Sequence, residues 1–126
     1  MAKTGGTGGL DDGLDLDLLN ANLSGDVAAV VEVLDLFCDQ ASEQLARMEV
    51  GLAPAAWKRL FHSLRGAALT VGAEALAEQC KAAEALAESE PNDRLEALTR
   101  VQSAAEAALA AAADYSARNR SQAASS

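Results

Sequence analysis

Apolar side chains recur at intervals of three and four residues through most of this chain. On a helix that advances about 100° per residue, this spacing gathers them into one stripe. Four long stretches and one short stretch show the pattern, and glycine or proline separates most of them. Because a helix with a single apolar stripe must bury that stripe against a neighbour, the pattern predicts helices packed around a shared core.

Capping and breaking residues give the expected boundaries of these helices. Asp26 is a suitable N-cap, prolines favour the first turn of a helix, and Gly72 is a stop signal. The predicted helices are a short one over 15–23, then four longer ones that begin at Asp26, run over 54–71, run over 73–89 and begin at Pro91.

The composition supports an all-α protein of one domain. Half of the 126 residues are hydrophobic, but only 3% are aromatic and alanine, the best helix former, is abundant. Short connections between long helices predict an antiparallel up-down-up-down four-helix bundle with a short additional N-terminal helix. We place the bundle at residues 14–117, between a glycine-rich flexible tail over 1–13 and a small, polar tail over 118–126.

The two cysteines lie at apolar positions of the predicted helices and are expected to be small buried hydrophobes. Their spacing fits no metal site, and a reducing compartment suits them. The stripe of the last helix is expected to bury Leu95, Leu98, Val101, Ala105, Leu109 and Ala112.

The formal charge of −9 argues against nucleic acid as a partner, because binding phosphates requires a basic surface. No apolar run reaches the length of about 18 residues that suggests a membrane span, and the amino terminus lacks a hydrophobic signal core. A cytoplasmic protein is expected.

The only histidine, His62, falls opposite the apolar stripe of the helix over 54–71. No Ser-His-Asp or Cys-His pattern accompanies it, and no second histidine stands four residues away to share a metal. A neutral imidazole can instead accept a phosphoryl group directly. That role needs a nearby cation, which Arg65 supplies, and a bare next turn for the donor to approach, which Gly66 supplies.

These residues belong to the run HSLRGAALTVGAEALAEQCKAAE, which closely resembles the histidine phosphotransfer (HPt) domains of bacterial multistep phosphorelays. The family pattern is roughly H-x-L-K-G-[SAG]-[SAG]-x-x-[LVIF]-G-x-x-x-L, followed by a small residue or cysteine and then an acid or amide. The matching positions are His62, Leu64, Gly66, Ala67, Ala68, Val71, Gly72, Leu76, Cys80 and Glu84.

The resemblance implies that His62 is the phosphoacceptor, reacting through Nε2, and that Gly66 gives clearance to the partner. Arg65 stands where the family usually has lysine; it keeps the positive charge and can bind phosphate oxygens in a bidentate manner. Glu84 either orients the imidazole ring or is simply solvated. Cys80 matches a packing position of the family.

Three further residues are candidates for contact with a partner. Lys58 and Lys81 are either rim cations of the docking surface or ordinary surface lysines. Leu69 lies on the His62 face and either anchors a partner helix or is an isolated exposed leucine.

The resemblance also implies the partners: receiver domains of response regulators and hybrid histidine kinases. The chain has no nucleotide-binding motif, so it is expected to bind no cofactor and to be a relay intermediate rather than an enzyme, with Mg²⁺ carried by the receiver. A monomer is the simplest expectation. Two alternatives stay open: a phosphoacceptor domain of a larger CheA-like or hybrid histidine kinase, and a helical adaptor that docks receivers without transfer.

Overall fold

The structure is a computed structural model that describes residues 13–125, and every regular element in that part of the chain is a helix. In chain order the elements are α2 (Leu16–Asn22), α3 (Val27–Ala46), α4 (Pro54–Thr70), α5 (Glu74–Glu84) and α6 (Pro91–Ser125). The prediction of an all-α protein is confirmed. Residues 1–12 of the predicted N-terminal tail lie outside the described residues.

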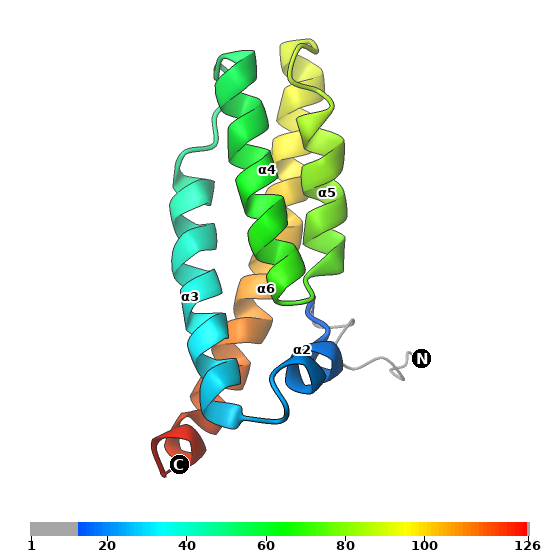
Figure 1. Cartoon of the computed structure of the whole chain (residues 1–126). Helices are drawn as coiled ribbons and strands as arrows, with labels where there is room; N and C mark the ends of the chain where they lie inside the picture. Colours follow the sequence, from blue (N-terminus) through cyan, green and yellow to red (C-terminus); the bar gives the residue numbers. More distant parts are fainter. Residues whose placement is uncertain (1–12, 126) are drawn as a thin grey trace, which may run out of the picture.

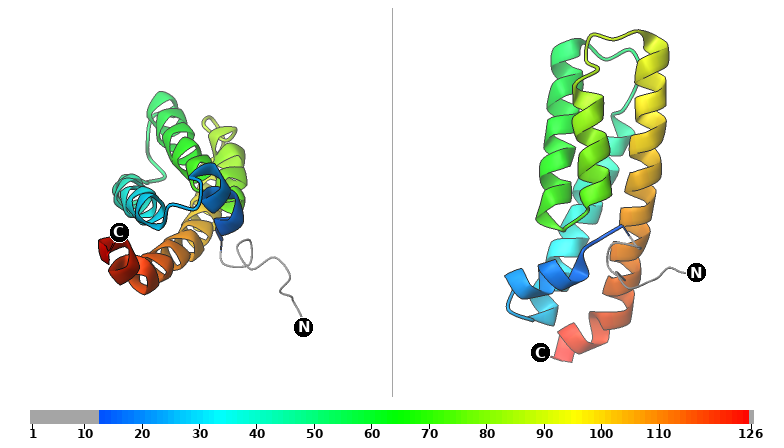
Figure 2. Two further views of the ribbon diagram at one scale, coloured as in Figure 1. Left: turned by 60° about the horizontal axis from the view of Figure 1, so that its bottom comes forward. Right: turned by 90° about the vertical axis from the view of Figure 1, so that its right-hand side faces the viewer.

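The four longer helices lie side by side, and α2 lies near one end of them (Figures 1 and 2). Helix α3 packs against α4 and α6, and α5 packs against the same two helices from another side. The ends of α3 and α6 extend past α4 and α5 (Figure 1). The shared core contains one large aromatic cluster of Trp57 and Phe61, and alanines fill much of the rest.

The predicted helix starts are found where the capping residues stand. The carboxylates of Asp15 and Asp26 accept hydrogen bonds from the third backbone N–H that follows each of them, at Leu18 and Ala29. Pro54 and Pro91 are the first residues of α4 and α6. These positions agree with the chemistry of helix N-termini, where unpaired N–H groups need an acceptor and proline lacks that group.

Gly72 ends α4 with φ +72°, a left-handed conformation that glycine adopts without penalty. Its carbonyl oxygen accepts a hydrogen bond of 2.9 Å from the backbone N–H of Asp15, so the segment before α2 is tied to the α4–α5 turn. A Cβ at Gly72 would lie 2.9 Å from the Asp15 Cβ. Gly72 is therefore required both by the turn and by this close approach.

We expect Gly72→Ala to lower the free energy of unfolding by roughly 2–3 kcal/mol, through left-handed strain and the clash with Asp15. The matched control is Gly25→Ala, because Gly25 has φ +74° but open space around it. The control is expected to lose only about 1–2 kcal/mol. Urea denaturation measures the free energy of unfolding of both variants. Equal decreases would show that Asp15 moves away from the new Cβ without an energetic penalty.

Three sequence-based expectations are wrong, and two of them concern the α5–α6 region. Leu95 is 53% exposed, and its neighbour Arg94, only 7% exposed, occupies the core side of α6 instead. Helix α5 ends at Glu84 rather than near residue 89, and the backbone N–H of Leu86 bonds to the carbonyl oxygen of Ala83 three residues earlier. Cys38 is only partly buried, whereas Cys80 is fully buried as expected.

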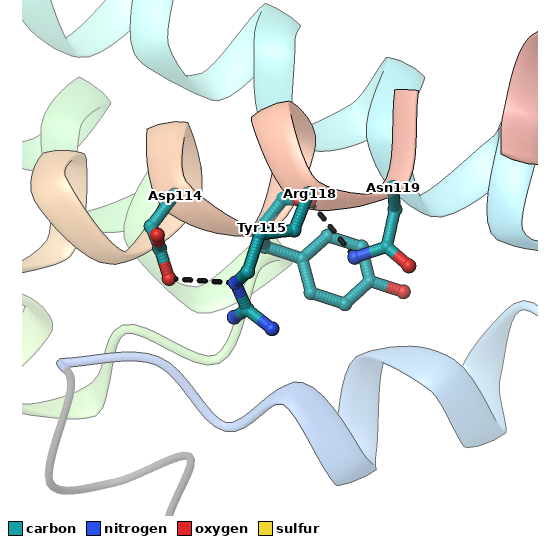
Figure 3. Close-up of polar contacts among 4 residues, drawn as sticks. All are labelled: Asp114, Tyr115, Arg118 and Asn119. Carbon is teal, nitrogen blue, oxygen red and sulfur yellow. Dashed lines mark hydrogen bonds and ion pairs between the residues drawn. The ribbon is translucent and has the colours of Figure 1, made fainter. Parts of the chain in front are cut away.

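The chain after residue 117, where a small, polar tail is predicted, is helical and forms the last part of α6. Side chains support this end of α6: the Arg118 guanidinium pairs with the Asp114 carboxylate, and the Asn119 amide donates to the Tyr115 carbonyl (Figure 3). Arg120 also pairs with Asp35 of α3 at 3.2 Å. Alanine-rich sequence with i,i+4 pairs favours helix even where few apolar side chains are available.

Candidate functional site

His62 projects from α4 into solvent, as the apolar periodicity predicted. Its side chain is 74% exposed, whereas Phe61 and Leu64 on the opposite face of the helix are fully buried. The buried side anchors α4 in the bundle, so the imidazole is presented from a rigid support. A group larger than a small molecule can reach it.

Glu84, at the last residue of α5, lies beside the imidazole. The distance from His62 Nδ1 to Glu84 Oε2 is 3.6 Å, and the glutamate side chain is only 28% exposed. This separation is within ion-pair range and longer than a hydrogen bond. Of the two interpretations of Glu84, the geometry favours the one in which the carboxylate faces Nδ1 and leaves Nε2 on the far side of the ring.

Gly66, one turn after His62, leaves the surface bare on that side. A Cβ built at Gly66 meets no other atom within 4 Å, so the space is open rather than filled by a neighbouring side chain. The Thr70 hydroxyl donates a hydrogen bond to the Gly66 carbonyl oxygen. The glycine is not needed for packing within the chain, which suits a role in clearance.

A depression on the surface joins His62 to α3. It runs between α3 and α4, and the Gln44 amide lies 3.4 Å from the Ser63 hydroxyl within it. Sequence reasoning missed the α3 side of this site, because glutamines on an exposed helix face give no signal until the neighbouring helix is known. The residues that line the depression are Gln40, Glu43, Gln44, His62, Ser63, Gly66, Ala67 and Thr70.

The candidate cations, Arg65, Lys58 and Lys81, lie on α4 and α5. Arg65 is partly buried, and Lys58 and Lys81 are exposed. Within residues 13–125, none of the three forms a side-chain hydrogen bond or an ion pair. Leu69 is exposed on α4, two turns after His62. No contact of Lys58, Lys81 or Leu69 with His62 is seen, so their placement is compatible with docking but does not require it.

Cys80 lies in the core beneath this surface and is not a second nucleophile. Burial, and to a lesser degree the Glu84 carboxylate, raise the pKa of its thiol to about 12, and the positive charge of Arg65 opposes the shift. The reactive thiolate is therefore negligible near neutral pH. The opposing effects of Glu84 and Arg65 also show that both charges act on the same small region of the bundle.

Other classes of site were also sought in the described part of the chain. Residues 13–125 contain no group of three or more His, Cys, Asp and Glu side chains that could hold a metal ion. Nor does any helix in this range combine the length and apolar composition needed to cross a bilayer.

The comparison with protein families identifies the family of this chain. A family model described as the Hpt domain matches residues 32–114, which include His62, Gly66 and Glu84. The curated proteins and the solved structures that were compared gave no match. Because the family match covers more than half of the chain, the chain belongs to the Hpt domain family, whose members carry out histidine phosphotransfer in phosphorelays.

Proposed function

We propose that this chain is an antiparallel up-down-up-down bundle that shuttles a phosphoryl group between aspartates of receiver domains through His62. The observation that carries the proposal is the combination of an exposed imidazole, a carboxylate 3.6 Å from its Nδ1 and open space at Gly66. An exposed histidine without a role would need neither of the two neighbours.

The transfer step follows from the position of Glu84. A carboxylate facing Nδ1 favours the neutral tautomer with its proton on Nδ1, so the lone pair of Nε2 is free. Nε2 attacks the phosphorus of an aspartyl phosphate in line, the N–P bond forms, and the P–O bond to the aspartate breaks to release its carboxylate. The ring becomes cationic as the bond forms, and Glu84 stabilises that charge. Donation to the next receiver is the reverse sequence.

The remaining stabilisation is divided between this chain and its partner. Arg65 would reduce the charge on the phosphoryl oxygens, and Lys58, Lys81 and Leu69 would contact the receiver surface. The chain itself is proposed to bind no cofactor, and Mg²⁺ belongs to the receiver. Most of the chemistry therefore depends on the partner, and this bundle contributes position and one nucleophile.

The test is incubation of the full chain with phosphorylated receiver domains, both from response regulators and from hybrid histidine kinases. Transfer is expected to give a label that acid removes and alkali leaves, the signature of a phosphohistidine. Failure of the wild-type chain to take label from any receiver of a broad panel from the same organism would contradict the proposal and favour an adaptor that docks without transfer.

Arg65→Ala is expected to slow transfer by about 5–30-fold, because a charge-assisted contact with the phosphoryl oxygens is lost. Arg65→Lys, which restores the residue usual in the family, is the matched control and should stay within about threefold of the wild type. Single-turnover transfer from a labelled receiver measures both. An unchanged rate in Arg65→Ala would make Arg65 an ordinary surface cation.

A further inference from the structure

A buried cluster of Trp57 and Arg94 lies at the end of the bundle where α4 begins and α5 ends. The Arg94 guanidinium stacks over the indole ring of Trp57, 4.3 Å from its centroid. The Trp57 ring is also close to Phe61, with 4.7 Å between ring centroids. Neither Trp57 nor Arg94 reaches the surface depression at His62, so the site described above does not account for them.

Arg94 is an unusual residue for this place. A cation in the first turn of a helix is opposed by the helix dipole, and Arg94 has no carboxylate partner within the described residues. Its hydrogen bonds instead go to backbone carbonyl groups: those of Val50 and Leu52 at 2.6 Å, and that of Ala87. The guanidinium therefore joins the α3–α4 connection to the segment after α5.

Trp57 completes the link to α5. Its indole N–H donates to the carbonyl oxygen of Ala83, at 2.6 Å and out of contact with solvent. The chain after Glu84 is rich in alanine and could continue as a helix, yet α5 stops there. The Ala83 carbonyl accepts from Trp57 as well as from the backbone N–H of Leu86, and the Ala87 carbonyl accepts from Arg94. The two side chains therefore anchor the segment in which α5 ends.

The same indole ring thus contacts the residues that precede both members of the His62–Glu84 pair. Phe61 is followed by His62, and Ala83 is followed by Glu84. We propose that Trp57 and Arg94 are positioning residues that set the register of α5 on α4 and thereby hold the Glu84 carboxylate against His62 Nδ1. The inference deepens the proposed function, on which it rests for its chemical meaning.

The first experiment measures the imidazole directly, without phosphotransfer. ¹⁵N NMR of the full chain gives the fraction of neutral His62 with its proton on Nδ1. Trp57→Phe keeps an aromatic ring and removes the indole N–H, and it is expected to shift that fraction in the same direction as Glu84→Gln. Phe37→Leu, a core change on α3 away from the α5 end, is the control and should leave the fraction unchanged.

The second experiment asks whether Trp57 acts through Glu84. Trp57→Phe alone is expected to slow transfer about fivefold, the loss typical of one hydrogen bond. In a double variant with Glu84→Gln, Trp57→Phe should cause no further loss of transfer rate, because the effects of substitutions at interacting residues are not additive. Arg94→Lys keeps the charge but not the forked geometry, and is expected to repeat both results if Trp57→Phe does not fold.

The inference is wrong if Trp57→Phe leaves the fraction of His62 protonated on Nδ1 unchanged, or if Phe37→Leu changes that fraction equally. It is also wrong if the losses of transfer rate in Trp57→Phe and Glu84→Gln multiply in the double variant. If the wild-type chain accepts no phosphoryl group, the proposed function fails, while the NMR comparison still decides whether Trp57 and Arg94 position Glu84.

Discussion

The His62→Gln variant is expected to take up no phosphoryl label from a receiver that labels the wild-type chain. The expected loss is about 10³-fold or more, because the reaction needs a nucleophilic nitrogen and an amide does not provide one. No other side chain near the site replaces it: burial raises the pKa of the Cys80 thiol to about 12 and keeps that sulfur protonated. His62 is also the only histidine of the chain.

Because His62 is exposed, its substitution should abolish transfer without unfolding the protein. With 74% of the side chain in solvent, the substitution removes no core contact, and the free energy of unfolding should change by less than about 0.5 kcal/mol. Circular dichroism and urea denaturation provide the control for folding. Label that persists in His62→Gln, or label that resists acid, would assign the phosphoryl group to another residue and contradict the mechanism.

The fold was largely predictable because local signals and packing agree in most of the helices. The caps at Asp15 and Asp26, the prolines that begin α4 and α6, and Gly72 at the end of α4 all stand where local chemistry requires them. The stripe of α4 is buried as its spacing indicated. In these elements no long-range contact opposes the local preference.

The region from α5 to α6 was not predictable for the opposite reason. Its sequence favours a continuous helix to about residue 89 and an apolar contact at Leu95, but a buried arginine binds three backbone carbonyl groups from two separate segments. From the local sequence, an arginine surrounded by alanine and acidic residues is predicted to lie on the surface. Only the tertiary structure shows that a tryptophan ring 37 positions earlier covers its guanidinium.

The candidate site also contains residues that the sequence predicted and residues that it could not predict. His62, Arg65 and Gly66 follow one another on a single helix, so their spacing alone placed them on one surface. Glu84 could be named from the family pattern, but whether it faces the ring depended on how α5 lies against α4. Gln40 and Gln44 join the site only through the packing of α3 on α4, which no local pattern specifies.

Gly66→Gln is expected to slow phosphotransfer by about 10–100-fold, since a misplacement of about 1 Å between reacting groups costs that much. A side chain at this position would stand in the open space one turn from His62, where the receiver must approach. The measurement is single-turnover transfer from a labelled receiver at several concentrations, which separates weaker docking from slower chemistry. Gly66→Ala, with one methyl group, should show a much smaller effect.

The stability of Gly66→Gln distinguishes obstruction of the partner from damage to the fold. Glycine within a helix is less favourable than glutamine by roughly 0.5–1 kcal/mol, and no atom of the chain occupies the space the new side chain enters. Gly66→Gln should therefore be at least as stable as the wild type while transferring more slowly. Ala113→Gln, on an exposed position of α6, is the matched control and should transfer normally. A Gly66→Gln protein that transfers at the wild-type rate would show that the bare turn is not needed for the partner, and the open space beside His62 would then need another explanation.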